Sequence, residues 1–168
     1  IQILVELIEM MQKGLAGFRR FLDVMETEPE IEDAPGAQPL ENVKGRVCYE
    51  DVSFHYSDDD PPVLSHVSIE IPAGKSIALV GPSGSGKTTI CSLLPRFYDV
   101  TGGKITIDGK DVRTLTLKSL RSQIGMVQQD VYLFAGTIRD NIAYGKPGAS
   151  MEEIIEAAKR ANIHDFIR

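Results

Sequence analysis

The chain has 168 residues, of which 42% are hydrophobic and 25% charged, a composition typical of a globular protein with its own core. The net charge is −6 and the basic residues are scattered, which argues against nucleic acid as the main partner. Cys48 and Cys91 are too few for a disulfide framework and indicate a reducing compartment, with Cys91 expected to be a buried free thiol. No apolar run approaches the ~20 residues that are needed to cross a bilayer.

The first 25 residues carry apolar side chains at helical spacing, which predicts an amphipathic helix. The apolar stripe consists of Ile1, Leu4, Val5, Ile8, Met11 and Leu15. This stripe either packs into the core of the same domain or requires a partner outside it. Residues 27–44 then combine prolines, glycine, acidic and small residues, a composition typical of a linker.

Strands are expected to dominate the next part of the chain. Residues 47–56 are rich in β-branched and aromatic side chains, and residues 67–71 alternate as in a half-buried strand. The apolar run at 77–80 predicts a buried strand. Residues 104–107 predict another strand, which is closed by the turn signal Asp108-Gly109.

Helical and strand patterns alternate after that turn. Residues 117–123 predict a short helix, and residues 124–127 predict a further buried strand. Ser150 and Glu153 form a capping-box pattern, which predicts a helix that continues to about Ala161. Strands that alternate with helices predict an α/β sheet, with an antiparallel part before residue 81.

Residues 81–88, which we call the P-loop, read Gly-Pro-Ser-Gly-Ser-Gly-Lys-Thr and fit G-x-x-x-x-G-K-[ST] without a mismatch. The P-loop follows a predicted strand and begins a predicted helix, an arrangement that wraps backbone N–H groups around phosphate. The glycines let the backbone approach the phosphates. Lys87 can reach the β- and γ-phosphates, and Thr88 offers a hydroxyl to Mg²⁺. The motif leaves open which base is bound and what happens to the phosphate.

Further motifs surround the P-loop at characteristic distances. They are Val-Ser-Phe-His-Tyr at 52–56, Leu-Pro-Arg-Phe-Tyr-Asp at 94–99, the glycine-flanked strand at 102–109, and the segments 124–130 and 133–142. With these motifs the chain, from about Val43 onward, resembles the nucleotide-binding domain of an ATP-binding cassette (ABC) exporter whose membrane domain is fused ahead of the ATPase. The resemblance implies an α/β P-loop NTPase of the ABC type, with a mixed sheet and an antiparallel β subdomain.

The resemblance also divides the chain into domains. Residues 1–26 would be the cytoplasmic end of the last transmembrane helix, residues 27–44 the linker, and residues 45–168 part of the nucleotide-binding domain. In the family, a Leu-Ser-Gly-Gly-Gln signature, a Walker B strand that ends in Asp-Glu, and a switch histidine follow later. None of these is found between Asp130 and Arg168. We therefore expect a domain that is truncated before these motifs and is inactive as an ATPase by itself.

Site residues follow from the matched motifs. The resemblance implies that Tyr56 stacks on adenine and that Gln129 contacts Mg²⁺ and the attacking water, in a loop that touches the membrane domain. Gln129 is preferred to its neighbour Gln128 because the family's glutamine directly precedes an acidic residue. Lys87 and Gln129 are the candidate catalytic residues, and Thr88 and Gln129 are the candidate metal ligands. The candidate ATP-binding residues are Tyr56, Gly81, Pro82, Ser83, Gly84, Ser85, Gly86, Lys87, Thr88 and Thr89.

The implied function is ATP binding with Mg²⁺ and, in the full-length protein, ATP hydrolysis that powers export across the cell membrane from its cytoplasmic face. The implied partners are a second nucleotide-binding domain, identical or not, and the transmembrane domain of the same transporter. A soluble P-loop kinase and a non-transport ABC ATPase remain as alternatives. A GTPase is disfavoured because the base-reading Asn-Lys-x-Asp motif is absent.

Overall fold

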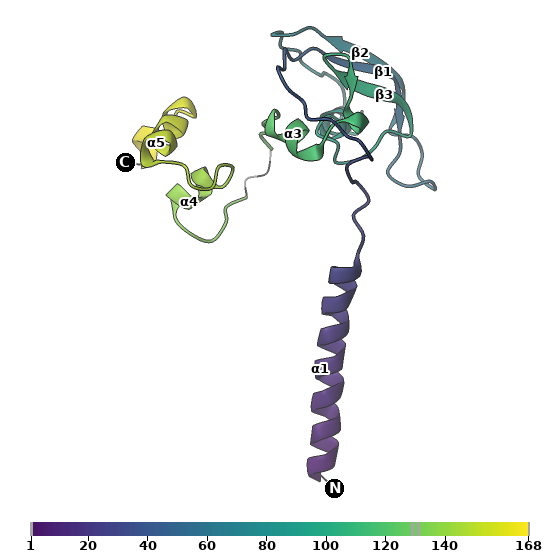
Figure 1. Ribbon diagram of the computed structural model, residues 1–168, viewed down its shortest axis with the longest axis vertical. Coiled ribbons are helices and arrows are strands. Elements are labelled where there is room, and N and C mark those ends of the chain that lie inside the picture. Colours follow the sequence, from purple (N-terminus) through teal and green to yellow (C-terminus); the bar gives the residue numbers. More distant parts are fainter. Residues whose placement is uncertain (1, 129, 131, 168) are drawn as a thin grey trace. The chain divides into compact units, whose positions relative to one another are not determined.

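The computed structural model describes residues 2–128, 130 and 132–167 (Figure 1). The chain divides into two compact units, Ile1–Gly125 and Met126–Arg168, which are described separately below. Among the residues that the structure describes, no helix combines the length and the apolar character that crossing a membrane requires.

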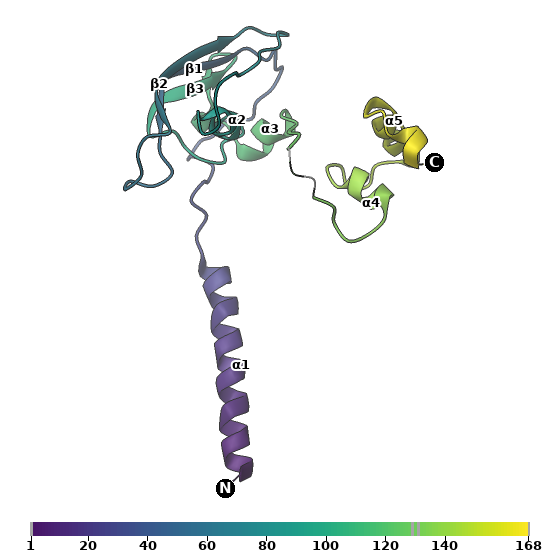
Figure 2. The same ribbon diagram turned by 180° about the vertical axis from the view of Figure 1, so that it is seen from behind.

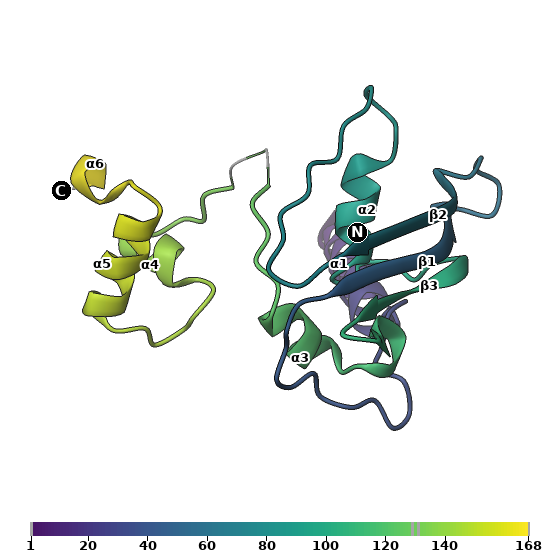
Figure 3. The same ribbon diagram turned by 90° about the horizontal axis from the view of Figure 1, so that it is seen from above.

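The first unit contains one four-stranded sheet with the strand order β2-β1-β3-β4. Its strands are β1 (Val47–Phe54), β2 (Leu64–Ile71), β3 (Gly102–Ile107) and β4 (Lys110–Asp111), and every neighbouring pair is antiparallel. The central position of β1 is visible in Figure 3. The strands predicted at 47–56, 67–71 and 104–107 are therefore confirmed, and β2 alternates between exposed and half-buried residues as expected.

Helices cover the face of the sheet that carries the core. α2 (Lys87–Leu93) and α3 (Leu117–Ser122) both lie on that face, and the single turn η1 (Val112–Thr114) precedes α3 (Figure 2). Leu93 of α2 and Leu120 of α3 join Val52, Phe54 and Ile105 of the sheet in one core cluster. The predicted helix at 117–123 is confirmed, and α2 ends before Pro95 as expected.

The turn between β3 and β4 has the tight geometry that its sequence predicts. Ile107 pairs with Lys110, so Asp108 and Gly109 form the two-residue turn, with φ of 51° and 83°. Positive φ at both positions defines a type I′ turn, whose twist matches that of the strands. The Asp108 carboxylate also accepts the backbone N–H groups of Lys44, Gly45 and Arg46 at 2.7, 3.2 and 2.9 Å. The turn thereby holds the segment that leads into β1.

The second half of the predicted linker is bonded to the sheet domain. The Gln38 N–H donates to Thr114 O at 2.9 Å, and the Thr116 N–H donates to Gln38 O at 3.0 Å. The Leu40 N–H donates to Ser119 Oγ at 2.9 Å, and the Leu40 side chain is buried in the core. The linker is therefore seated along η1 and the start of α3.

α1 (Gln2–Glu26) is a continuous helix, in agreement with the predicted amphipathic segment. Most of its described apolar side chains are exposed, including Met11, Leu15, Phe18 and Phe21, and Leu22 is half-buried. None of them belongs to the core cluster of the sheet domain. The described part of the apolar stripe, Met11 and Leu15, is thus exposed.

The second unit is helical and contains α4 (Ile138–Ala143), α5 (Met151–Arg160) and α6 (His164–Ile167). Ser150 and Glu153 form the predicted capping box at the start of α5. Thr137 and Asp140 form a second one at the start of α4. Each box satisfies backbone N–H groups that a helix start leaves without partners.

Two strand predictions are wrong. The runs at 77–80 and 124–127 form no strand, and Val80 is 93% exposed while Val127 is fully exposed. A strand requires neighbours for its N–H and C=O groups, and within the described ranges neither run has a ladder partner. The expected mixed sheet is accordingly represented only by its antiparallel part. The predicted burial of Cys91 is also wrong, because its thiol lies on the exposed side of α2.

We expect Asp108→Asn to lower the free energy of unfolding by about 1 kcal/mol, because charge-assisted hydrogen bonds become neutral ones at a partly solvated site. Partial burial raises the pKa of Asp108, but the N–H groups of Arg46, Lys44 and Gly45 outweigh it and hold the pKa below 3.8. The stabilisation is therefore complete above pH ~3.8 and is lost as the pH falls through the lower folded-state pKa. Urea unfolding at several pH values measures the difference, and a difference that does not change with pH would contradict this role.

Candidate functional site

The P-loop connects the exposed run at 77–80 to the start of α2. Gly86 is the N-cap of α2, with φ 80° and ψ 5° in the left-handed region. The first N–H groups of a helix have no partners within the helix. The loop therefore delivers free backbone donors at the point where the motif predicts that phosphate binds.

The side chain of Lys87 lies inside the P-loop. Its Nζ donates to Gly81 O at 3.0 Å, to Pro82 O at 2.7 Å and to Ser85 Oγ at 3.2 Å. The ammonium group is thus bound by the P-loop itself, rather than extended into solvent. Because these acceptors are uncharged, phosphate oxygens would bind the same ammonium more strongly.

Two glycines of the P-loop are required for different reasons. Gly84 and Gly86 both have φ near +80°, which side chains rarely adopt. A Cβ at Gly86 would also lie 2.6 Å from Leu64 Cδ2 and 3.3 Å from Val63 O, whereas a Cβ at Gly84 would meet nothing within 4 Å. The loop therefore packs closely on the start of β2 at Gly86 and is open at Gly84.

α2 is fixed to the sheet by a buried hydrogen bond. Tyr49 of β1 is 3% exposed, and its hydroxyl donates to Ile90 O of α2 at 2.8 Å. Burial raises the pKa of Tyr49, so the hydroxyl remains a neutral donor. This bond satisfies a carbonyl near the end of the helix and sets the distance between α2 and β1.

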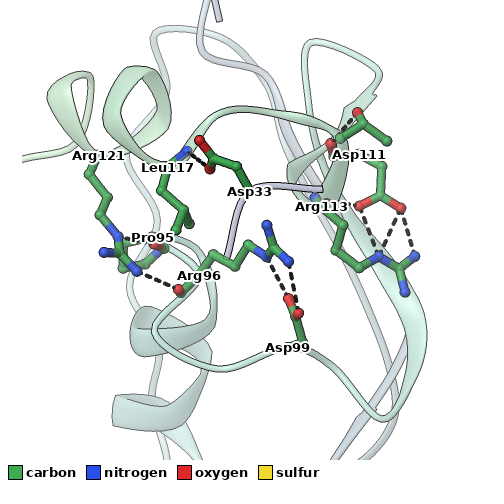
Figure 4. A network of polar contacts seen from close by, with 9 residues as sticks. Asp33, Pro95, Arg96, Asp99, Asp111, Arg113, Leu117 and Arg121 are labelled. Carbon is green, nitrogen blue, oxygen red and sulfur yellow. Dashed lines mark hydrogen bonds and ion pairs between the residues drawn. The ribbon is translucent and has the colours of Figure 1, made fainter. Parts of the chain in front are cut away.

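The turn after α2 is held by a network of arginines and acids (Figure 4). Arg121 of α3 donates from Nε to Pro95 O at 3.0 Å and from Nη2 to Arg96 O at 2.8 Å. Arg96 is buried with φ 55°, and its guanidinium pairs in bidentate fashion with Asp99 at 2.7 and 3.0 Å. The hydrogen bonds with Asp99 hold the pKa of Arg96 above its usual range.

The linker reaches the same network. Asp33 Oδ1 accepts the N–H of Leu117, the first residue of α3, at 2.7 Å. α3 therefore contacts the linker at its first turn and the turn after α2 through Arg121. The remaining nitrogen of Arg96, Nη1, is buried and is unpaired within the described part of the chain.

The predicted adenine residue lies beside the P-loop helix. The hydroxyl of Tyr56 is 3.0 Å from Oγ1 of Thr89, and the ring is 51% exposed. Phe54 and Tyr98 contact this ring with centroids at 4.9 and 5.1 Å, both nearly perpendicular to it. A half-exposed aromatic ring is thus fixed close to the phosphate-binding loop.

The structure brings most of the predicted site residues together. Residues 81–89 form one loop and the first turn of α2, and Tyr56 is joined to them through Thr89. Thr88 is exposed at the helix start. Gln129 lies outside the described residues. The sequence motifs indicate no role for Tyr98 or Arg121, although Tyr98 lies within the motif at 94–99.

Comparison with known proteins assigns the family. Residues 64–168 match the family described as ABC transporter. The chain is 52% identical over 161 residues to the uncharacterized ABC transporter ATP-binding protein YwjA of Bacillus subtilis, covering 96% of this chain and 28% of that protein. It is 49% identical over 156 residues to an ATP-dependent lipid A-core flippase of Syntrophus aciditrophicus, covering 93% of this chain and 26% of that protein.

A solved structure gives the same result. A bacterial Atm1-family ABC exporter with ATP bound superimposes with a TM-score of 0.82 at 43% identity, covering 95% of this chain and 28% of the exporter chain. The chain belongs to the ABC transporter family and corresponds to the ATP-binding region of fused ABC exporters. It spans roughly a quarter of the length of these relatives.

Gly84 and Gly86 provide a matched pair of substitutions. We expect Gly84→Ala to lower the free energy of unfolding by about 1 kcal/mol through backbone strain alone. Gly86→Ala adds a close contact with Leu64 at the same φ, so we expect a loss about 1–3 kcal/mol larger. Chemical denaturation of both variants measures the difference. Equal losses would show that the loop does not pack on Leu64 as described.

Proposed function

We propose that this chain binds ATP, with the adenine base on Tyr56 and the triphosphate in the P-loop. The observation that carries the proposal is the hydrogen bond between Tyr56 and Thr89, which joins the aromatic ring to the phosphate-binding helix. The family match and the ATP-bound relative support it. An aromatic platform beside the loop suits a nucleotide better than an inorganic phosphate.

The residues at the start of α2 fit a magnesium nucleotide. Thr88 presents an exposed hydroxyl oxygen directly beside Lys87, and oxygen ligands are those that Mg²⁺ prefers. A bound Mg²⁺ would neutralise part of the negative charge of the triphosphate. The role of this chain is to present Thr88 to the metal, Lys87 to the phosphate oxygens, and the backbone N–H groups of Gly86 to Thr89 to the remaining oxygens. We assign Gln129 to the same metal on the strength of the family motif.

In the full-length protein we propose ATP hydrolysis that drives export across the cell membrane. Residues 1–26 would belong to the last helix of a fused membrane domain, 27–44 to the linker and 45–168 to the nucleotide-binding domain. The exposed apolar side chains of Met11, Leu15, Phe18 and Phe21 are consistent with a helix that packs on that membrane domain. We further propose pairing with a second nucleotide-binding domain on the cytoplasmic face of the membrane.

The proposal is tested first at Lys87. We expect Lys87→Ala to weaken ATP binding by more than tenfold, because it removes the ammonium that faces the phosphates. Its hydrogen bonds lie within the loop, so the melting temperature should change little. Isothermal titration of the purified full-length protein measures binding. A variant that binds ATP normally would refute the phosphate role. Lys104→Ala, which removes an exposed lysine of β3, serves as the control.

Tyr56 tests the base contact separately. We expect Tyr56→Ala to weaken ATP binding by roughly tenfold, given ~1–3 kcal/mol for a stacked base. Binding of inorganic tripolyphosphate, which has no base, should be unchanged. An unaltered affinity for ATP would exclude Tyr56 as the base platform.

A further inference from the structure

Tyr56 must hold a defined orientation to serve as a stacking surface, and the structure shows three contacts that restrain it. The hydroxyl is bonded to Thr89, and the ring meets Phe54 and Tyr98 at interplanar angles of 83° and 88°. Edge-to-face pairs at these centroid distances are favourable arrangements of aromatic rings. The ring is thereby fixed on two sides and at its tip, while half of its surface remains open.

We propose that Tyr98 is a positioning residue for nucleotide binding, which holds the Tyr56 ring in the orientation that receives the base. The inference rests on the proposed function, in which Tyr56 is the base platform. Tyr98 does not need to touch the nucleotide for this role. It acts through Tyr56, whose ring it contacts at a centroid distance of 5.1 Å.

Tyr98 differs from the other aromatic support, Phe54, in a way that makes its role specific. Phe54 is a buried member of the core cluster, so it serves the fold as well as the site. Tyr98 is 41% exposed and lies outside that cluster. Its ring also contacts Phe54, with centroids at 5.7 Å, and the three rings therefore touch one another in pairs.

The position of Tyr98 in the chain links base binding to phosphate binding. Thr89 lies in the first turn of α2, and Tyr98 lies in the turn that follows the same helix. That turn is held by Arg121 through Pro95 and Arg96 (Figure 4). The Thr89 hydrogen bond and the Tyr98 contact thus come from α2 and the turn that follows it, whereas Phe54 belongs to β1. A fixed α2 places the phosphate site and the base platform at a constant distance.

The test compares two neighbouring aromatic residues of similar exposure in the purified full-length protein. Tyr98→Leu removes the ring that contacts Tyr56, and Phe97→Leu removes a 43% exposed ring that lies instead beside the Arg121 guanidinium, at 5.3 Å. Affinities for ATP and for inorganic tripolyphosphate are measured by displacement of a fluorescent nucleotide. We expect Tyr98→Leu to weaken ATP binding about three- to tenfold and to leave tripolyphosphate binding unchanged. Phe97→Leu should change neither affinity.

Tyr98→Phe provides the rescue, because it keeps the ring and removes only the hydroxyl. We expect it to restore the affinity for ATP. Normal ATP binding by Tyr98→Leu would overturn the proposal, and so would an equal loss of ATP and tripolyphosphate binding, which would indicate damage to the P-loop itself. The Tyr56→Ala variant distinguishes the base contact of Tyr56 from the positioning role of Tyr98. If Tyr56→Ala loses affinity for ATP while Tyr98→Leu does not, the base contact is supported and the role of Tyr98 is refuted.

Discussion

The placement of α2 is the constraint on which the rest of this structure depends. At its start, Gly86 adopts a left-handed conformation against Leu64, a position that a side chain could not share without displacement. In its middle, at Ile90, the buried hydroxyl of Tyr49 ties the helix to β1. Beyond its end, Arg121 binds the two carbonyls of the following turn. α2 is therefore fixed at its start, in its middle and just beyond its end, and the P-loop is the segment that leads into this fixed helix.

The linker is part of the same arrangement. Its second half is bonded to η1, α3 and the Asp108 turn, and Asp33 accepts the first N–H of α3. Because α3 also carries Arg121, one short helix contacts both the linker and the end of α2. Arg96 is buried in this region, and its guanidinium forms an ion pair with Asp99. Its Nη1 atom is also buried and has no hydrogen-bond partner among the described residues. A charge in such a position is costly to remove from its carboxylate.

Local sequence signals predicted the parts of the fold that depend on local chemistry. Asp108-Gly109 specifies its own turn through positive φ, and Ser150 with Glu153 specifies a helix start through reciprocal hydrogen bonds. The P-loop was located from its motif because its function requires fixed residue types at fixed spacing. At 77–80 and 124–127, the prediction of a buried strand rests on apolar character alone. Burial and pairing of a strand depend on neighbours that a local pattern does not report, and the described residues supply none.

The site at Tyr56 likewise combines a residue that the sequence could predict with contacts that it could not. The motif resemblance placed an aromatic residue at the base, but it could not indicate that Thr89, Phe54 and Tyr98 hold the ring. Thr89 and Tyr98 are 33 or more positions away from Tyr56 in the sequence. They contact Tyr56 only when α2 lies on the sheet. The positive φ of Arg96 could not be predicted from the sequence either, because arginine has no preference for the left-handed conformation.

Hydrogen exchange of the purified full-length protein, with and without ATP and Mg²⁺, tests most directly whether the P-loop and Tyr56 form one nucleotide site. The account predicts slower exchange in peptides that cover residues 81–90 and 54–57, because both become covered by the same ligand. Peptides from the Asp108 turn, which lies outside the site, should exchange at an unchanged rate. Protection of the P-loop peptide without any protection at 54–57 would contradict the claim that the base and the phosphates are bound by one connected site.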